Sequence, residues 1–302
     1  MSLPAGSKVL LRRNVELSKY CTMQIGGPAD YFSEPRSEEE LSEVLQFIRE
    51  ENLPVFILGK GSNVVFSDEG FRGAVITLIH FRDQDIRFDQ DAGEVTASGG
   101  VHLYRLATAC RDAGLSGAEF LSGIPGTVGG AVMMNAGFSR FAGQKNEISD
   151  LVKEVMVLDE QGERRRLSAV ELGFSYRHSN LQGKIVLEAT LNLWRRPSDV
   201  IAQEIRANFE YRNREQDLKH PSSGSIFKNP SKPHPSAGRL IDQLGLKGTS
   251  VGGMTVSPRH GNYFINSGGA TCSDLLSLIA LIQKAVLNGY GIRLEPEVRV
   301  IS

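Results

Sequence analysis

The sequence predicts a protein of mixed helix and strand with more than one domain. A helical pattern with apolar residues at Leu41, Val44 and Ile48 leads directly into an apolar run at residues 55–58, which is the order of an α/β unit. The chain has 302 residues, enough for two or three domains with separate cores. A third observation is the stretch at residues 123–137, where five glycines allow a ligand or a neighbouring backbone to approach the main chain closely.

The composition is that of an ordinary globular enzyme, with 40% hydrophobic and 23% charged residues. The formal net charge of −1 provides no general attraction for nucleic acid or acidic membranes, and the sequence has neither an apolar run of membrane-spanning length nor the apolar core of a signal peptide. Cys21, Cys110 and Cys272 are widely spaced, as expected for free thiols in a reducing cytoplasm. The six histidines lack the spacing of metal ligands. We therefore expect a cytoplasmic protein with no metal, no nucleic acid, no membrane insertion and no obligatory protein partner.

Local patterns predict the individual elements. Ser37 and Glu40 have the spacing of a capping box, so the first helix should begin there, and residues 103–113 predict a second helix that ends before a glycine. The remaining predictions are strands at residues 74–78, 95–97, 151–158, 164–167, 185–194 and 293–301, a loop at residues 216–235, and helices at residues 199–212, 237–244 and 273–288. Ser273 should cap the last helix, and Gly289 should follow its end.

Two glycine-rich loops are candidates for phosphate binding. Residues 59–63 (GKGSN) directly follow the predicted strand at residues 55–58, a position where α/β proteins hold phosphates, and residues 123–137 offer further main-chain N–H groups. Neither loop has the P-loop pattern or the dinucleotide pattern, since Val64 stands at the third glycine position of the latter. A tight turn packed against a sheet is the alternative for either loop alone.

Three polar clusters could carry chemistry. Arg177 stands among aromatic and hydroxyl residues at 174–179, and an arginine can bind a carboxylate through two parallel bonds; a surface salt bridge is the alternative. Residues 223–230 (SGSIFKNP) combine hydroxyl, ammonium and amide donors that suit a phosphate-bearing ligand. Glu295 and Glu297, two apart on a predicted strand, should face the same side and flank either a site or a solvated edge.

Taken in order, seven segments resemble the UDP-N-acetylenolpyruvoylglucosamine reductase family, from about residue 15 to the end of the sequence. They are GKGSN (59–63), GIPGTVGGAVMMNAG (123–137), SYRHS (175–179), GSIFKNP (224–230), AGRLIDQLGLKG (237–248), HGNYFIN (260–266) and EPEVR (295–299). The resemblance implies an α+β fold, in which an FAD-binding domain of the vanillyl-alcohol-oxidase or PCMH type precedes a smaller α/β substrate-binding domain. The implied limits are residues 58–204 for the FAD-binding domain and 205–290 for the substrate-binding domain, with an N-terminal portion at 1–57 that the tail at 291–302 joins.

The resemblance also implies a flavoenzyme of peptidoglycan precursor synthesis. NADPH would reduce a non-covalently held FAD. The reduced flavin would then convert the enolpyruvyl ether of a nucleotide-sugar substrate, UDP-N-acetylglucosamine enolpyruvate, to a lactyl ether, giving UDP-N-acetylmuramate. At 302 residues the chain resembles the shorter form of the family, which lacks an inserted lid tyrosine. Tyr176, Tyr211 and Tyr263 are open candidates for the residue that closes over the substrate.

The resemblance assigns roles to individual residues. Arg177 and Glu297 would polarise the substrate carboxylate, and Ser225 would deliver a proton to the α carbon, helped by Lys228 or a proton chain because serine is a poor acid. The implied FAD-binding residues are Gly59, Lys60, Gly61, Ser62, Asn63, Gly123, Ile124, Pro125, Gly126, Thr127, Gly129, Gly130, Ala131, Asn135 and Gly137. The implied substrate-binding residues are Tyr176, Lys228, Asn229, His260 and Asn262.

Two alternative functions share part of this pattern. A flavin oxidase of the same fold would share the glycine loops but would need neither the GSIFKNP segment nor Glu297. Such oxidases often tether the flavin through His or Cys, for which His80, His102 and Cys110 are candidates. A non-enzymatic nucleotide-sugar-binding protein would have no use for the FAD loops.

Overall fold

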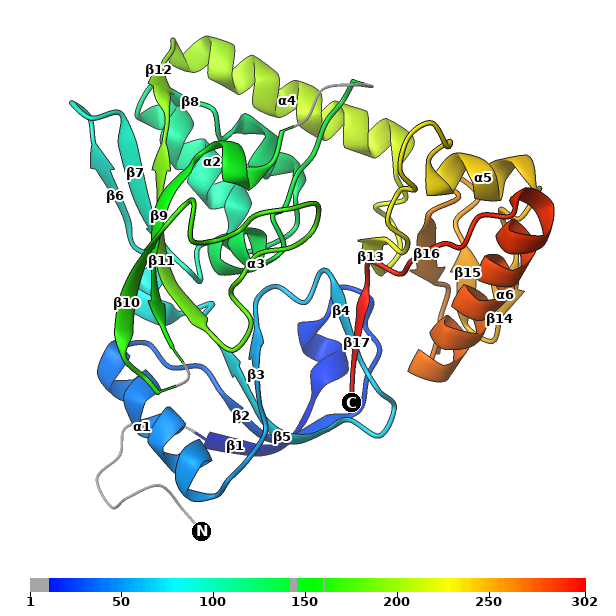
Figure 1. Ribbon diagram of the computed structural model, residues 1–302, viewed down its shortest axis with the longest axis horizontal. Helices are drawn as coiled ribbons and strands as arrows, with labels where there is room; N and C mark the ends of the chain where they lie inside the picture. The colour runs from blue at the N-terminus through cyan, green and yellow to red at the C-terminus, as the bar shows by residue number, and fades with distance from the viewer. Residues whose placement is uncertain (1–10, 142–145, 160) are drawn as a thin grey trace. The chain divides into compact units, whose positions relative to one another are not determined.

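The structure, a computed structural model, describes residues 11–141, 146–159 and 161–302 and divides into two compact units (Figure 1). The first unit contains the described residues up to Arg12 together with Phe32–Lys60 and Ala74–Tyr211, and the second contains Arg13–Tyr31, Gly61–Gly73 and Arg212–Ser302. The chain therefore passes between the units several times. The domain limits implied by the sequence stay a prediction, because compact units and functional domains need not share limits.

The first unit is built around an antiparallel sheet of five strands in the order β10-β9-β11-β7-β6. These strands are β6 (Ile86–Asp89), β7 (Glu94–Ser98), β9 (Val152–Leu158), β10 (Arg164–Ser168) and β11 (Ile185–Asn192). Helices α2 (Leu103–Asp112) and α3 (Val128–Met133) pack on this sheet through Leu106, Cys110 and Val132, which share one buried core with Val155 and Ala189 of the strands (Figure 1). The antiparallel pairing of β9 with β10 and with β11 confirms the predicted strands of this sheet and the hairpin at residues 151–168.

A second sheet has the strand order β1-β2-β5-β3, and three of its strands run from one unit into the other. Its members are β1 (Leu11–Glu16), β2 (Pro28–Ser33), β3 (Val55–Leu58) and β5 (Phe71–Thr77). β3 pairs in parallel with the second half of β5, from Val55 opposite Ala74 to Leu58 opposite Thr77. Parallel neighbours end at the same edge of the sheet, so the residues that follow β3 and β5 come together there.

Helix α1 (Glu38–Glu50) begins as predicted, but its cap differs in one detail. Ser37 Oγ accepts the Glu40 N–H at 3.3 Å, as a capping residue should. The Glu40 carboxylate instead accepts the Arg36 N–H at 2.7 Å, so the box is not reciprocal. Three acidic residues in the first turn add favourable charge at the positive end of the helix dipole.

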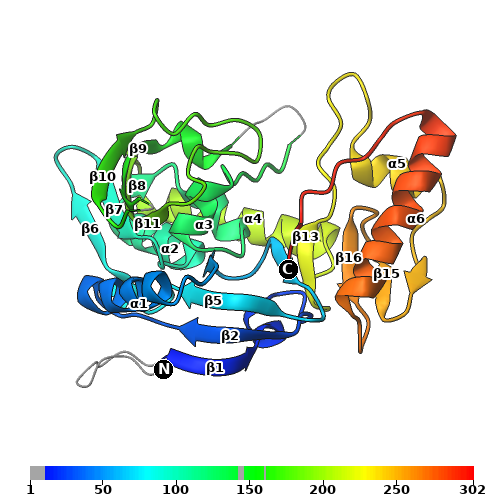
Figure 2. The same ribbon diagram turned by 60° about the horizontal axis from the view of Figure 1, so that its bottom comes forward.

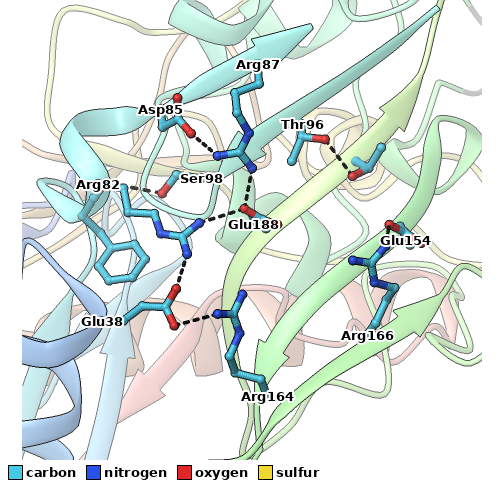
Figure 3. Close-up of polar contacts among 12 residues, drawn as sticks. Glu38, Arg82, Asp85, Arg87, Thr96, Ser98, Glu154, Arg164, Arg166 and Glu188 are labelled. Atoms are coloured by element: carbon cyan, nitrogen blue, oxygen red, sulfur yellow. Dashed lines mark hydrogen bonds and ion pairs between the residues drawn. The ribbon is translucent and has the colours of Figure 1, made fainter. Parts of the chain in front are cut away.

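A network of ion pairs joins α1 to the five-stranded sheet of the first unit (Figure 3). Glu38 of α1 binds Arg82 and lies 3.2 Å from the Arg164 guanidinium of β10. Glu188 of β11 accepts from Arg82 at 2.9 Å and from Arg87 of β6 at 2.7 Å. Isolated surface pairs contribute little, but a network of partly buried groups with shared partners holds its elements more firmly.

The second unit contains a four-stranded sheet in the order β13-β16-β15-β14, with α5 and α6 packed against it (Figure 2). The elements are β13 (Ser222–Ser225), β14 (Ser250–Val251), β15 (Met254–Val256), β16 (Tyr263–Asn266), α5 (Ala237–Gln243) and α6 (Cys272–Tyr290). Phe227, Leu240, Phe264 and Leu278 meet in its core. A separate parallel pair joins β17 (Arg299–Ile301) to β4 (Val64–Phe66).

The predicted limits of the last helix are wrong at both ends. α6 is capped by Thr271, whose Oγ1 accepts the Asp274 N–H at 3.0 Å while the Asp274 carboxylate accepts the Thr271 N–H at 3.0 Å. This reciprocal pair outcompetes a cap at Ser273. At the other end Gly291, with φ of +68°, terminates the helix, whereas Gly289 lies inside it and packs against Leu244.

α6 is also the one helix among the described residues that is long and apolar enough to cross a membrane by length and composition. Its buried residues, including Leu275, Leu278 and Ile282, belong to the core of the second unit, as in the core helix of a globular protein.

The remaining elements are short or connect others. They are η1 (Leu17–Tyr20), η2 (Phe81–Gln84), β8 (Leu115–Ser116), η3 (Glu119–Gly123), η4 (Ile148–Asp150), β12 (Trp194–Arg195) and α4 (Ser198–Glu215). α4 confirms the predicted connecting helix, although Phe209 is exposed and only Ile201 and Ile205 of the predicted apolar face are buried.

Candidate active site

A small pocket in the first unit lies where several strands begin or end. Gly59 follows β3, Leu78 and Ile79 follow β5, Gly99 and Gly100 follow β7, and Lys184 precedes β11. Ile57, Leu58, Thr127, Gly129, Gly130, Met133 and Val186 complete the lining of a cavity of about 70 Å³. Because glycine leaves the main chain uncovered, such walls present peptide groups to a polar ligand at a sheet edge.

The two glycine loops meet in this pocket. A Cβ at Gly59 would lie 2.7 Å from Thr127 Oγ1, so a side chain there would displace the Thr127 hydroxyl. Of the predicted FAD-binding residues, Gly59, Thr127, Gly129 and Gly130 line the same cavity. The interpretation of the two loops as parts of one site therefore has a structural basis within the first unit.

The start of α3 is less open to a phosphate than the sequence suggests. Thr127 Oγ1 caps the helix by accepting the Gly130 N–H at 3.3 Å. Val128 and Gly129 donate their N–H groups to main-chain carbonyls at 2.9 and 2.8 Å. A phosphate oxygen would have to displace these bonds to use the first N–H groups of the helix.

Several predicted FAD-binding residues of the first unit stand outside the pocket lining. In the described part of the chain these are Lys60, Gly123, Ile124, Pro125, Gly126, Ala131, Asn135 and Gly137. Gly126 has an evident structural task, since its carbonyl accepts the Leu103 N–H at 3.0 Å and fixes the start of α2.

Sequence reasoning missed three features of the pocket. Gly99 and Gly100 directly follow a strand, which is the same signal that identified Gly59, so they could have been found. Lys184 carries no such signal. Among the described residues that line the pocket, Lys184 is the only charged one, and its ammonium group would favour an anionic ligand.

The second half of the GKGSN loop belongs to the second unit and has a different setting. Gly61 has φ of +68°, and a Cβ there would lie 2.2 Å from the Tyr20 carbonyl oxygen, so packing alone requires glycine. Asn63 Nδ2 donates to the main-chain carbonyl of Glu297 at 3.2 Å. Asn63 thus supports the segment that contains a predicted catalytic residue. Among the described residues, the N–H of Ser62 meets no acceptor.

Arg177 occupies a tight turn in the first unit. Ser175 and His178 exchange two main-chain hydrogen bonds of 3.1 Å around Tyr176 and Arg177, and Arg177 has φ of +57°, which is rare for a residue with a side chain. Its guanidinium donates to the carbonyl oxygen of Asn135 at 3.4 Å, lies 4.8 Å from the centre of the Tyr176 ring and is largely buried.

Asn135 holds this turn in place. Its Nδ2 donates to the Ser175 carbonyl at 3.0 Å and to the Glu147 carboxylate at 3.2 Å, and its Oδ1 accepts the Ser149 N–H at 3.2 Å. Glu147, which sequence reasoning missed, lies 4.0 Å from the Arg177 guanidinium. Because Asn135 is buried and its amide is engaged at both ends, its observed contacts position Arg177.

Ser225 and Glu297 lie close together in the second unit. Ser225 ends β13, and the Glu297 N–H donates to the carbonyl oxygen of the next residue, Ile226, at 2.7 Å. Ser225 is half-buried, and in the described parts of the chain its Oγ has no hydrogen-bond partner. This hydroxyl is therefore available to a ligand.

The prediction that Glu295 and Glu297 share one face of a strand is wrong. The strand contains only Arg299–Ile301, and residues before it are extended without strand pairing except for one bridge from Phe227 to Pro296. Glu295 is exposed and pairs with Lys228 at 2.5 Å, whereas Glu297 is half-buried beside Ile226. The two carboxylates thus have different surroundings.

The predicted substrate-binding residues of the second unit fall into two groups. Lys228 and Asn229 are accessible, and Asn229 Oδ1 accepts the Ala237 N–H at the start of α5 at 3.1 Å. Asn262 is buried, and its amide exchanges two hydrogen bonds with the main chain of Phe227, at 2.9 and 2.8 Å. His260 accepts the Asn262 N–H at 3.2 Å. Asn262 thus has the geometry of a brace rather than of a substrate ligand.

The three tyrosines that could close over a substrate differ in exposure. Tyr263 is only 5% exposed and Tyr176 is 43% exposed, so Tyr263 has no freedom to act as a lid. The Tyr211 ring packs against Phe138 with its centre 5.9 Å away.

The residues that a flavin oxidase could use as a tether do not line the glycine pocket. Burial raises the pKa of the Cys110 thiol to about 12, which makes it a poor nucleophile. Burial and then the neighbouring Lys60 lower the pKa of His102. A larger open groove of about 770 Å³ in the first unit, lined by Arg82, Arg87 and Arg105 among others, includes none of the predicted site residues.

Comparisons with known proteins give two family matches along the chain. Residues 29–168 match the family described as FAD binding domain, and residues 216–301 match the family described as UDP-N-acetylenolpyruvoylglucosamine reductase, C-terminal domain. Gly59, Gly99, Thr127 and Gly130 lie in the first match, and Ser225 lies in the second.

Full-length relatives and solved structures extend these matches. The chain is 41% identical over 292 residues to UDP-N-acetylenolpyruvoylglucosamine reductase of Bacillus licheniformis, covering 96% of this chain and 93% of the relative. It is 38% identical over 292 residues to the reductase of Bacillus subtilis, with the same coverage. The crystal structure of the reductase from Thermus caldophilus matches with a TM-score of 0.81 and 36% identity over 97% of this chain and 100% of that one.

A more distant structure shares only the fold. Physcomitrella patens BBE-like 1 matches with a TM-score of 0.50 and 17% identity, over 65% of this chain and 45% of that one. The predicted α+β fold with a PCMH-type FAD-binding domain and the predicted FAD cofactor are confirmed by these comparisons. The chain belongs to the UDP-N-acetylenolpyruvoylglucosamine reductase family of FAD-dependent oxidoreductases.

Proposed function

We propose that this chain reduces UDP-N-acetylglucosamine enolpyruvate to UDP-N-acetylmuramate, with NADPH as the reductant, in peptidoglycan precursor synthesis. The observation that carries the proposal is the accessible Ser225 hydroxyl, which stands beside Glu297 in the segment that matches the reductase C-terminal domain. An oxidase acting on another small substrate has no need of this arrangement.

The glycine pocket suits FAD. Any Cβ at Gly59 would lie 2.7 Å from Thr127 Oγ1, so this wall of the pocket has room only for glycine, and Lys184 supplies a positive charge for the diphosphate. Gly59, Thr127, Gly129, Gly130 and Lys184 are therefore the proposed FAD-binding residues of the first unit. Held by these residues, FAD would supply hydride-transfer chemistry between NADPH and the β carbon of the enolpyruvyl group.

The chain's own residues are proposed to stabilise the negative charge of the substrate and to donate a proton to it. Hydride addition leaves negative charge on the substrate carboxylate, which the planar Arg177 guanidinium is suited to stabilise. Glu297 is proposed to orient the same carboxylate. Ser225 Oγ is proposed to donate the proton that completes the reduction at the α carbon. Contacts made only in the transition state are worth on the order of 10²- to 10³-fold in rate.

Lys228 and Asn229 are the proposed ligands of the UDP diphosphate. Lys228 is now paired with the exposed Glu295, and an exposed pair of this kind is weak enough for a diphosphate to replace the carboxylate. For Asn262 and His260 we propose a supporting role, since Asn262 fixes the main chain next to Lys228.

Anaerobic stopped-flow absorbance near 450 nm tests the proposal. The purified holoenzyme is reduced with NADPH and mixed with UDP-N-acetylglucosamine enolpyruvate. We expect rapid bleaching by NADPH, followed by recovery of absorbance on addition of the substrate. Recovery only after oxygen enters would identify a flavoprotein with another electron acceptor and would remove the assigned roles of Ser225, Lys228 and Asn229.

A further inference from the structure

Ser225 needs a proton source of its own. A serine hydroxyl is a weak acid, so a serine that donates a proton must take one back from a neighbour as the reaction proceeds. Lys228, three residues along the chain, pairs with Glu295 and is the proposed ligand of the UDP diphosphate, so its ammonium group has another task. The Ser225 hydroxyl has no partner among the described residues in this structure, so we consider groups that lie near it without being bonded to it.

Tyr263 is such a group. It lies directly opposite Ser225 in the antiparallel pair of β13 and β16, and residues opposite one another in such a pair direct their side chains to the same face. A Cβ built on Gly224, the residue before Ser225, would lie 4.0 Å from the Tyr263 hydroxyl. The phenol therefore reaches the main chain at the end of β13, next to Ser225.

The surroundings of the phenol keep it protonated and place a cation beside it. Burial raises the pKa of Tyr263, as does the negative charge of Glu297, while a polar interaction with Arg212 at the end of α4 lowers it. The His260 ring packs 4.8 Å from the Tyr263 ring, and burial lowers the pKa of His260, so this neighbour is uncharged at neutral pH. A buried phenol beside an arginine is a proton donor whose anion would have a fixed counter-charge.

We infer that Tyr263 is the proton relay behind Ser225, an inference that rests on the proposed function. As the Ser225 O–H bond breaks and a C–H bond forms at the substrate α carbon, the Tyr263 O–H proton moves to Ser225 Oγ. The resulting tyrosinate is held by Arg212 and recovers its proton from water. The new C–H bond uses the electron pair that hydride addition leaves on the substrate, the electron pairs of the broken O–H bonds stay on oxygen, and the net proton comes from solvent. Tyr263 acts through Ser225 and is a positioning and relay residue.

The test compares Tyr263→Phe, which removes only the hydroxyl, with Tyr290→Phe, a matched change on α6 where the hydroxyl contacts Gln243 at 3.3 Å. Both variants are measured as holoenzymes in the two half-reactions. Flavin reduction by NADPH should stay within about twofold of wild type in both. Reoxidation by the enolpyruvyl substrate should be slowed about 10- to 100-fold in Tyr263→Phe only, less than the ~10²–10⁴-fold loss expected when a direct proton donor is removed.

Reoxidation in mixtures of H₂O and D₂O separates a relay from a packing role. If two protons move together in wild type, a plot of its reoxidation rate constant against the deuterium fraction should be curved. The same plot for Tyr263→Phe should be a straight line. The inference is overturned if Tyr263→Phe reoxidises at the wild-type rate, if it keeps the curved plot, or if wild type gives a straight line. If Ser225→Ala also reoxidises at the wild-type rate, the proposed role of Ser225 as proton donor is wrong. If the substrate does not reoxidise wild type, the proposed function itself is wrong.

Discussion

Replacing Asn262 with alanine should show whether this residue supports the main chain of Phe227 or contacts the substrate. Asn262 is 2% exposed, and its amide satisfies both the N–H and the carbonyl of Phe227, at 2.9 and 2.8 Å. Asn262→Ala leaves both main-chain groups buried without partners, at about 1–3 kcal/mol each, so the free energy of unfolding should fall by about 2–6 kcal/mol. The loosened segment begins two residues after Ser225, so kcat for substrate reduction should fall while KM changes little.

Urea unfolding at one fixed saturating FAD concentration measures the stability change, because FAD binding itself raises apparent stability. Asn213→Ala, an exposed position on α4, is the matched control and should change the free energy of unfolding by less than about 0.5 kcal/mol. Steady-state kinetics then separate the two roles. A variant with wild-type stability and a raised KM would show that Asn262 contacts substrate, and the reasoning from its hydrogen bonds would be refuted.

Three further predictions concern other parts of the site. In a fluorescence titration, Lys184→Met should weaken FAD binding about 10-fold and make the affinity less dependent on salt concentration. Lys184→Arg should keep most of the wild-type affinity and salt dependence. Equal affinity in all three proteins would remove Lys184 from the FAD site. Arg177→Lys should slow substrate-dependent flavin reoxidation on the order of 10²-fold because a point charge cannot replace a planar fork, and normal turnover would dismiss its role. Burial raises the pKa of the Cys21 and Cys110 thiols to about 12, so both stay protonated at pH 8 and a disulfide reagent should label neither before unfolding. Rapid labelling of the native protein would contradict that burial.

Elements with local causes were predictable from the sequence, and the error at the start of α6 combines an overlooked local cap with a distant partner. α1 begins at its expected cap because Ser37 and its partner lie within one turn. α6 begins two residues early because Thr271 and Asp274 bond reciprocally and the carboxylate of Asp68 accepts the N–H groups of Cys272 and Ser273. The Thr271–Asp274 box is a local pattern that the sequence contains, whereas Asp68 lies over two hundred residues away, so no local pattern could reveal that second partner.

The same distinction applies to the FAD pocket. Gly59 could be found because it opens a glycine-rich loop directly after a strand. The loop containing Thr127 could be found because it is rich in glycine and leads into a helix. Lys184 precedes an ordinary strand, and nothing in its neighbours marks it as lining a cavity. Its place follows from the antiparallel pairing of β11 with β7, which brings the start of β11 to the end of β7, and the end of β3 from the other sheet lines the same pocket. A charged residue at a strand end becomes recognisable as a ligand only when the strand order is known.

Two catalytic candidates lie at or next to a residue with positive φ, and a buried asparagine bonds the main chain near each. Arg177 has φ of +57° and its turn is fixed by Asn135, while Ser225 follows Gly224 with φ of +70° and the chain beyond it is fixed by Asn262. Neither segment can rely on a long strand ladder to keep its side chain in place. An asparagine amide offers one donor group and one acceptor in the manner of a peptide group, so it can supply the missing main-chain partners inside the protein. The family resemblance implies ligand binding for both asparagines, which stays a prediction, and an Asn that bonds a ligand looks identical in a sequence to an Asn that bonds a turn. The placement of both reactive side chains should therefore depend on these amides more than on the regular secondary structure around them.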